Sequence, residues 1–409
     1  MKRELIIKKR GVLVLTVVSL FVVFNTFKNV YTLNIHKGKG ISSIERRSNI
    51  QSSNAKLKLK LSNAKYHFFL SDYKDSLRNY TNTLELNPVL VPAWLGISEL
   101  LIDENKKNEA LLVLKYLKSI TPYSNDVNWD ISLLLVRMNE YKLAIKTLID
   151  VAENNYLKRV DAFRIFDKLQ IDKKYLINNF KSGTLLSSYL DHLLSKGFVD
   201  ESSYLWDFMA KNNIFVEENI RNKYVEFLIR NNLLKQAYSI WSESYEDLGM
   251  NNLVWNGDFE YEIENKGFNW RISTIKEVDI EIDNESYYSG SKSLKVVFNG
   301  KANINFHHVK QHIPLDGGKK YSLSYAYSSK DITTKSGVFW EIKCNNSKFS
   351  IKTDVILGNS EWKRNVLEFE NASDCEGISL VLKRNPIRKL DSKISGTVWF
   401  DDLRLNALN

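Results

Sequence analysis

The sequence predicts a multidomain α plus β protein with an N-terminal transmembrane helix, an α-helical repeat array and a C-terminal antiparallel β-sandwich. Three observations predict it. An uncharged apolar run fills residues 11–27, helical periodicity with a 34-residue repeat follows, and a period of two begins near Leu253. The expected parts are a basic flank (1–10), a transmembrane signal anchor (11–27), a tether (28–55), a helical repeat domain (56–250) and a β-sandwich (251–409).

The positive charge of the chain is concentrated at its N-terminus. Residues 1–60 hold 13 basic and 2 acidic side chains, whereas the rest of the chain holds 45 basic and 46 acidic ones. The formal net charge of +10 therefore belongs to the surroundings of the apolar run, and the folded part is close to neutral. Proteins that bind nucleic acids carry a basic stripe or patch on the folded domain. The sequence therefore predicts no nucleic-acid partner.

The apolar run Gly11–Phe27 carries no charged residue and follows five basic residues. Its length is near the lower limit for a helix that crosses a bilayer. A cleaved signal peptide is the main alternative, but no small-x-small cleavage pattern follows the run. A buried helix of a soluble domain is the second alternative. We expect an uncleaved anchor that attaches the chain to a membrane.

Basic residues lie on both sides of the run, so their number alone does not orient it. The denser cluster precedes the run, which favours a cytoplasmic N-terminus. Cys344 and Cys375 are the two cysteines of the chain and are 31 positions apart. A disulfide between them would suit an oxidising compartment, and two reduced, buried thiols are the alternative. We expect a single-pass protein of the bacterial inner membrane with its bulk in the periplasm or at the cell surface.

Between residues 56 and 250, signature residues recur at a spacing of 34. Pro88 and Pro122 each end a helical run, and Ala110 and Ala144 occupy positions where two helices would cross closely, with Trp94 16 residues before Ala110. These spacings resemble the tetratricopeptide repeat, with repeats at 56–89, 90–123 and 124–157. The resemblance implies a solenoid that holds a protein partner in its groove. The alternative is a helical bundle without a partner.

The β-rich part opens with Asn-Leu-x-x-Asn-Gly-x-Phe-Glu from Asn252, followed by Gly-Phe-x-Trp from Gly267. Apolar and small polar residues alternate in the run from Tyr321 to Tyr327, and Gly and Asn punctuate the strands. The opening and the closing segment 396–405 resemble carbohydrate-binding modules of families 4 and 9. The resemblance covers about 150 residues and implies a jelly-roll sandwich of galactose-binding-like topology. Such sandwiches also serve as purely structural modules.

The same resemblance implies a structural Ca²⁺ between the first and last strands, because such modules commonly hold one. The matching ligands are Asp258, Glu260, Asp401 and Asp402. The alternative is that these carboxylates cap turns or pair with Arg271 or Arg404.

Glycan contact would require aromatic rings outside the packed core. The rings that meet this condition are Trp270, Tyr287, Tyr288, Phe339 and Trp362. We assign Trp255, Trp340 and Trp399 to the core.

No pattern in the sequence indicates catalysis. His307 and His308 are adjacent on a predicted strand and would point to opposite faces, which argues against a metal site shared with His312. No phosphate-binding loop, nucleophile elbow or zinc-ligand cluster is present. We therefore expect a non-enzymatic adaptor with a protein partner and a polysaccharide partner, resembling bacterial repeat proteins that accompany exopolysaccharide export. The alternatives are an accessory subunit of a polysaccharide-processing enzyme and a structural scaffold.

Overall fold

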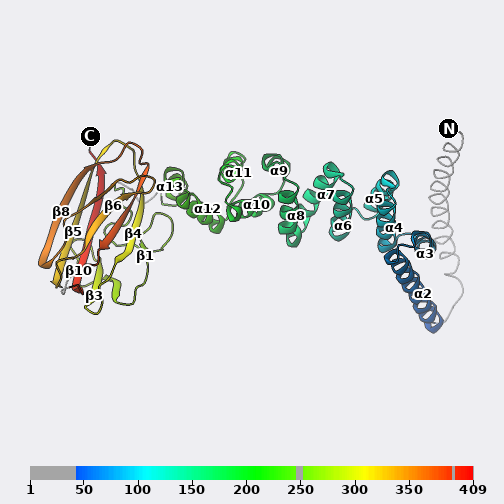
Figure 1. Ribbon diagram of the computed structural model, residues 1–409, viewed down its shortest axis with the longest axis horizontal. Coiled ribbons are helices and arrows are strands. Elements are labelled where there is room, and N and C mark those ends of the chain that lie inside the picture. The colour runs from blue at the N-terminus through cyan, green and yellow to red at the C-terminus, as the bar shows by residue number, and fades with distance from the viewer. Residues whose placement is uncertain (1–42, 246–251, 389–391, 409) are drawn as a thin grey trace. The chain divides into compact units, whose positions relative to one another are not determined.

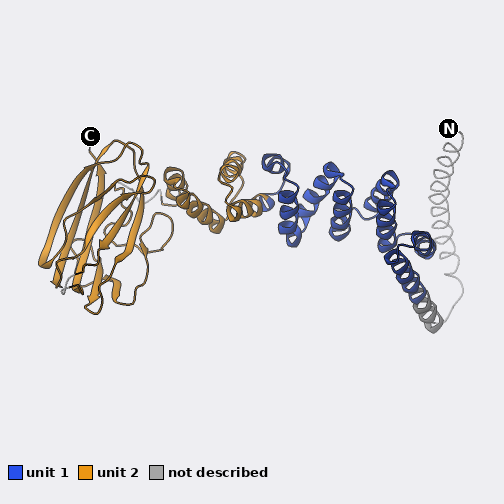
Figure 2. Ribbon diagram, in the orientation of Figure 1, with its two compact units in different colours: residues 1–185 blue, residues 186–409 orange. Residues whose placement is uncertain are grey.

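The computed structural model describes residues 43–245, 252–388 and 392–408, with side chains from residue 54 onward. The order of the elements is shown in Figure 1. Two compact units comprise residues 1–185 and 186–409 (Figure 2). The predicted membrane span at 11–27 lies outside the described residues. Within the described part of the chain, no helix combines the length and the apolar composition needed to cross a bilayer.

Twelve helices lie in the described part of the chain, and they precede every strand. They are α2 (Ser43–Phe69), α3 (Tyr73–Leu86), α4 (Val91–Asp103), α5 (Lys107–Ile120), α6 (Asn125–Arg137), α7 (Tyr141–Asn154), α8 (Tyr156–Lys168), α9 (Lys173–Asn179), α10 (Gly183–Lys196), α11 (Val199–Lys211), α12 (Glu218–Arg230) and α13 (Leu234–Ser242).

The helices of the first unit form hairpins that repeat every 34 residues. The second helices of three successive hairpins begin at Tyr73, Lys107 and Tyr141. The turn before each of them contains a residue with positive φ at the same 34-residue spacing, at Ser71, Asn105 and Asn139. A left-handed residue lets the chain leave one helix and reverse direction, and asparagine tolerates that conformation well. The period therefore reflects one turn geometry used repeatedly.

Small residues let the helices of the first unit approach each other. Ala64, Ala110 and Ala144 are fully buried, and the hydroxyl of Ser76 donates to the carbonyl oxygen of Ala64 at 2.9 Å. A Cβ atom on Gly96 would lie 2.2 Å from the ring of Tyr80, so only glycine fits there.

Two of the signature residues meet where the second hairpin begins. The Nε1 of Trp94 donates to the carbonyl oxygen of Pro88 at 2.8 Å, at the point where α3 gives way to α4. The residues that carry the repeat in the sequence are therefore those at which the hairpins pack.

The described residues of the second unit form ten strands in two five-stranded antiparallel sheets. Sheet A has the order β1 (Arg271–Ile272), β4 (Phe306–Pro314), β9 (Gly377–Arg384), β6 (Phe339–Cys344) and β7 (Ser350–Lys352). Sheet B has the order β2 (Val278–Asp283), β3 (Ser293–Asn299), β10 (Ser395–Ala407), β5 (Lys320–Ile332) and β8 (Gly358–Glu370). Each described pairing between neighbouring strands is antiparallel.

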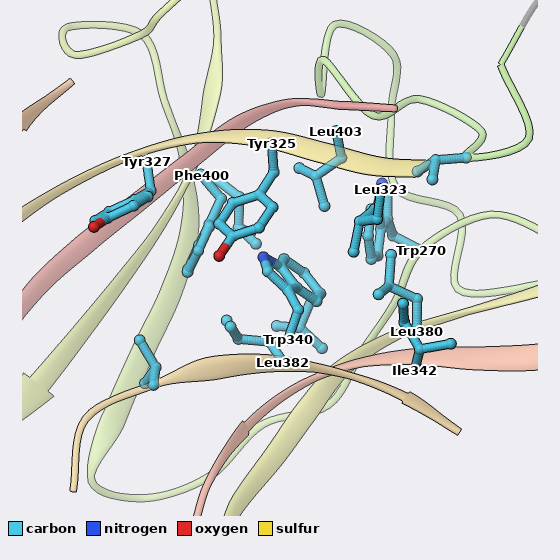
Figure 3. Close-up of a cluster of buried hydrophobic side chains, with 14 of the residues drawn as sticks. Trp270, Leu323, Tyr325, Tyr327, Trp340, Ile342, Leu380, Leu382, Phe400 and Leu403 are labelled. Atoms are coloured by element: carbon cyan, nitrogen blue, oxygen red, sulfur yellow. The ribbon is translucent and has the colours of Figure 1, made fainter. Parts of the chain in front are cut away.

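The two sheets share one hydrophobic core, as expected of a β-sandwich. Figure 3 shows Ile342, Leu380 and Leu382 of sheet A facing side chains of sheet B such as Tyr325, with Trp340 reaching between the layers. Trp340 is fully buried, which agrees with its assignment to the core. The helical and antiparallel β parts together make the α plus β class predicted from the sequence.

Within the second unit, α12 and α13 pack against sheet A. Trp241 of α13 meets Trp255 edge to face, with ring centroids 5.3 Å apart. Glu226 of α12 pairs with Arg271 at 2.8 Å and accepts a hydrogen bond from the backbone N–H of Gly267. Trp255 is therefore buried, as assigned, and it packs against helix α13.

Candidate functional site

The structure separates the five aromatic residues expected to contact a glycan. Trp270 is fully buried, stacks on Phe259 at 5.4 Å and donates its Nε1 hydrogen to the carbonyl oxygen of Asn256. Phe339 points away from the core but is only 4% exposed, with Lys352 over its ring. The expectation that these two rings are accessible is therefore wrong. Tyr287, Tyr288 and Trp362 remain partly exposed.

Tyr288 and Trp362 meet on the outer face of sheet B, although they are far apart in the sequence. Their ring centroids lie 6.0 Å apart at an interplanar angle of 52°. The guanidinium carbon of Arg364 lies 5.4 Å from the centroid of Tyr288, a cation–π distance. We call this group, Tyr288, Trp362 and Arg364, the Tyr288 face.

Strand register explains why these side chains point outward. Arg364 of β8 pairs with Ala326 of β5, which pairs with Asp401 of β10. Directly opposed residues of antiparallel strands share a face, and residues two apart on one strand do so as well. Trp362 therefore lies on the same face as Arg364. The short side chain of Ala326 lies between these longer ones.

Two of the predicted Ca²⁺ ligands instead fix the loop that carries Tyr288. One carboxylate oxygen of Asp401 accepts hydrogen bonds from the backbone N–H groups of Tyr288 and Ser289, at 2.8 and 2.7 Å. Glu260 accepts from the backbone and hydroxyl of Ser291, both at 2.6 Å, and from the backbone of Lys292. We call these contacts of Glu260 and Asp401 the loop clasp.

Glycine is required inside the loop clasp. Gly290 has a φ of +66°, and a Cβ there would lie 2.2 Å from Oε1 of Glu260. Loop and carboxylate therefore fit together only because this position lacks a side chain.

The other two predicted ligands do not join the loop clasp. Asp402 pairs with the guanidinium groups of Arg364 and Arg404, and Asp258 is exposed. Among the described residues, only His67, Asp72 and Asp75 bring three potential ligand atoms within 4.8 Å of one another. There Asp72 caps α3, so its carboxylate already has a structural role. Glu260, Asp401 and Asp402 therefore direct carboxylate oxygens at N–H donors or arginines, Asp258 is exposed, and the structural Ca²⁺ stays a prediction of the resemblance.

Chelation is accordingly expected to leave the sandwich unchanged. Adding EDTA or CaCl₂ to the full chain should shift its thermal unfolding by less than about 1 °C, because Glu260, Asp401 and Asp402 already have donors within the protein. Glu260→Gln should lower stability, because an amide NH₂ group would face the donors of Ser291 or Lys292. The measurement is differential scanning fluorimetry in detergent. If CaCl₂ raised the unfolding temperature by several degrees and EDTA reversed this rise, the sandwich would bind a structural Ca²⁺.

Asp401 should make the sandwich less stable as pH rises. Burial, and then the negative charges of Asp258 and Glu260, raise the pKa of Asp401 to about 6, although the N–H donors of its loop oppose this. An unfolded aspartate ionises near pH 4, so between pH 4 and 6 the folded state binds the extra proton. The stability that Asp401 contributes is therefore full below pH 4 and lost by about pH 6, with an upper bound of about 3 kcal/mol.

Amide hydrogen exchange of β5 and β10 in the full chain, at pH values from 4 to 7, measures this effect. The difference between wild type and Asp401→Asn isolates the titration, because all other groups are common to both proteins. An equal pH dependence in the two proteins would contradict the assignment.

The three histidines on β4 do not form a metal site. A register irregularity between Phe306 and Val309 brings the rings of His307 and His308 to 4.7 Å. His312 lies farther along the strand, next to the hydroxyl of Ser379 at 3.1 Å. Burial, followed by the charges of Arg271 and Lys310, lowers the pKa of His312 to about 4. This imidazole is therefore neutral at physiological pH.

A pocket of about 330 Å³ lies in the second unit between α13 and the sandwich, and none of the predicted site residues lines it. Its carboxylate, Asp316, pairs with Lys235 at 2.9 Å and with Lys319 at 2.7 Å. The two ammonium groups lower the pKa of Asp316 to about 2. Asp316 is therefore already paired with two lysines at the edge of a mainly apolar pocket.

Sequence analysis missed Arg364, whereas it named Arg404 as an alternative partner of the predicted Ca²⁺ ligands, and Arg404 pairs with Asp402. Alternation along β8 carried the signal for Arg364, since it lies two residues after Trp362 on the same strand. An irregularity in β10 between Asp401 and Arg404 changes the register there.

Comparison with known proteins finds no matching family model and no matching curated protein. Solved structures that match the β-sandwich include carbohydrate-binding modules. "Family 16 Carbohydrate Binding Module-2" is 15% identical over 38% of this chain and 99% of its own, with a TM-score of 0.27. "TmCBM61 in complex with beta-1,4-galactotriose" is 18% identical over 39% and 100%, with a TM-score of 0.27.

A third similar chain is the enzymatically active domain of tailspike protein 4 of bacteriophage CBA120. It is 14% identical over 38% of this chain and 21% of its own, with a TM-score of 0.29. At TM-scores below 0.5 these likenesses assign no function to this chain.

Proposed function

We propose that this chain is a non-enzymatic, membrane-anchored binding protein whose β-sandwich contacts a glycan through the Tyr288 face. The observation that supports this is the pair of accessible rings, Tyr288 and Trp362, held 6.0 Å apart on one side of sheet B. Aromatic faces suit the apolar C–H face of a pyranose, and nearby donors such as Arg364 suit its hydroxyl groups.

Preorganisation also supports glycan contact by the Tyr288 face. The loop clasp fixes the backbone of Tyr288 through Asp401, so the ring position is set before a ligand arrives. Restricting such a loop in advance reduces the entropy lost on binding. An aromatic residue on an unrestrained loop would lack this advantage.

Affinity electrophoresis of the full chain in detergent, with a panel of plant and bacterial polysaccharides in the gel, tests the proposal. Trp362→Ala and Tyr288→Ala should each reduce retardation at least tenfold in apparent affinity. Tyr175→Ala on α9 is the matched control, because that ring has a similar exposure, 49% against 43% for Tyr288. If no polysaccharide retards the chain, or the face variants match wild type, the glycan role fails and the scaffold alternative remains.

We further propose that the tetratricopeptide-like helices hold a protein partner. Three exposed apolar residues recur at the 34-residue spacing, each at the start of a hairpin: Val89, Tyr123 and Leu157, with exposed fractions of 57%, 95% and 68%. A repeated array places equivalent residues along one edge, so they form a row. Exposed apolar side chains in such an arrangement favour an interaction surface.

Crosslinking in membranes tests the protein partner. Tyr123→Ser combined with Leu157→Ser should reduce recovery of a defined crosslinked protein several-fold. Phe215→Ser is the control, since this exposed apolar residue lies outside the row. If the double variant recovered the same protein at wild-type levels, the row would not be part of the interface.

For location, we propose a single pass through a bacterial inner membrane at residues 11–27, with the bulk in the periplasm. The disulfide between Cys344 and Cys375 supports an oxidising compartment. The part played in exopolysaccharide export rests only on the resemblance of the layout. A periplasm-dependent phosphatase fused after Asn409 should be active, and an inactive fusion would place the bulk in the cytoplasm.

A further inference from the structure

A second arginine, Arg404 of β10, lies beside Arg364 of the Tyr288 face. Nε of Arg404 donates to Oδ1 of Asp402 at 2.6 Å, and Arg364 donates to Oδ2 of the same carboxylate. Asp402 is almost completely buried, with 8% of its side chain exposed, whereas the side chains of Arg364 and Arg404 are 33% and 58% exposed. Two cations therefore share one covered anion and present a net positive charge outward.

The local backbone explains how the two arginines come together. Asp402 has a φ of +48°, and the pairing of β10 with β5 shifts between Asp401 and Arg404. A bulge of this kind re-aims side chains. Arg404 then lies opposite Ser324, whose hydroxyl accepts a hydrogen bond from Arg364 at 3.2 Å. The guanidinium groups come from β10 and β8 and meet across β5.

Of the carboxylates grouped around Asp401, two are held by donors within the fold, and Asp258 is exposed. Asp401 is fully buried and faces the N–H groups of the loop, and Glu260 is bound by the donors of Ser291 and Lys292. Exposed guanidinium groups recognise carboxylates through two parallel hydrogen bonds, with a geometry that a neutral hydroxyl does not match.

From this juxtaposition we propose that the glycan of the Tyr288 face is acidic, with a uronic acid carboxylate bound by Arg404 and Arg364 while neighbouring sugar rings stack on Tyr288 and Trp362. The inference rests on the proposed glycan role of that face. It adds a charge requirement that the aromatic pair alone does not impose.

Matched polymers test the charge requirement with the full chain in detergent. The probes are polygalacturonate and alginate, each compared with its fully esterified form, in affinity electrophoresis at 50 and 500 mM NaCl. Binding to at least one acidic polymer should exceed binding to its ester at least tenfold and weaken at high salt, because screening reduces attraction between exposed charges. Arg404→Gln should remove most of this preference.

Two variants separate the effect of the paired N–H donors of the guanidinium group from the effect of its charge. Arg404→Lys keeps the charge and should recover only part of the affinity, because an ammonium cannot form the paired contact. Lys330→Gln on β5 is the control, since it removes an exposed cation from the same sheet without touching Asp402.

The outcomes distinguish the two levels of the proposal. Equal binding of acidic polymers and their esters, wild-type binding by Arg404→Gln, or binding of neutral glycans alone would overturn the acidic class while the Tyr288 face retained a glycan role. If none of these polymers and none of the wider panel binds, the proposed glycan role fails as a whole.

Discussion

Replacing Arg384 with methionine is expected to lower the free energy of unfolding of the sandwich by about 3–5 kcal/mol, a loss typical of breaking buried polar contacts. Arg384 ends β9, is fully buried and donates to four acceptors. They are the carbonyl oxygens of Ile304, Ser336 and Ser392 and the side-chain oxygen of Asn303. Methionine fills similar space but leaves these acceptors without their donor.

The guanidinium of Arg384 is itself costly to bury, and burial lowers its pKa. Removing it therefore returns some desolvation energy, but the protein acceptors stay buried, which is why the net effect remains destabilising. Arg384 connects three separate segments that lead into strands. The loss of stability should therefore extend beyond β9.

Hydrogen exchange of β5, β9 and β10 in the full chain measures the effect of Arg384→Met. Lys383→Met is the matched control, since the neighbouring side chain forms a partly exposed pair with Glu341 at 2.8 Å. Such pairs contribute about 1 kcal/mol or less. Protection within about 1 kcal/mol of wild type in Arg384→Met would show that water replaces the guanidinium.

The helical hairpins could be predicted because their determinants are local. Pro88 and Pro122 follow α3 and α5 directly, and the left-handed turn at Asn105 recurs at Asn139. A turn needs only a few consecutive residues, so its signature survives in the linear sequence.

The faces of the last strand could not be predicted by simple alternation. Alternation places Trp399, Asp401, Leu403 and Leu405 on one face, but the bulge at Asp402 reverses the pattern. Leu403 and Leu405 are buried in the core, whereas Trp399 is only partly buried and donates to Asp283 at 2.7 Å. The assignment of Trp399 to the core is therefore wrong. A single left-handed residue, Asp402, caused the error; aspartate tolerates positive φ, but it is also common in regular strands and turns, so its type alone did not locate the bulge.

The Tyr288 face depends on contacts distant in sequence. Tyr288 and Trp362 lie in different segments, and the loop clasp holds the loop where Tyr288 meets Trp362 of β8. Trp270 was misjudged for a related reason, because it precedes the two-residue strand β1, where alternation has too few positions to define a face. The sequence therefore suggested that aromatic rings contact a glycan, but it could not identify which of these rings are exposed.

The second large effect is expected at the disulfide. Cys344 ends β6, Cys375 precedes β9, and these two strands pair with each other, so the bond closes a loop that contains β7 and β8. Opening a loop of 31 residues should lower the free energy of unfolding by about 3–4 kcal/mol on the chain-entropy estimate. Cys344→Ala combined with Cys375→Ala should show this loss in urea unfolding of the full chain.

Reduction provides the control for this prediction. A phosphine reductant should destabilise the wild type to about the level of the double variant, and should leave the double variant unchanged. Both sulfur-bearing side chains are fully buried, so alkylation must be performed on unfolded protein. If chain purified from membranes takes up two alkyl groups without prior reduction, the alternative of two free thiols is correct. The stability of the sandwich would then no longer depend on the compartment, and the structural support for a periplasmic location would be lost.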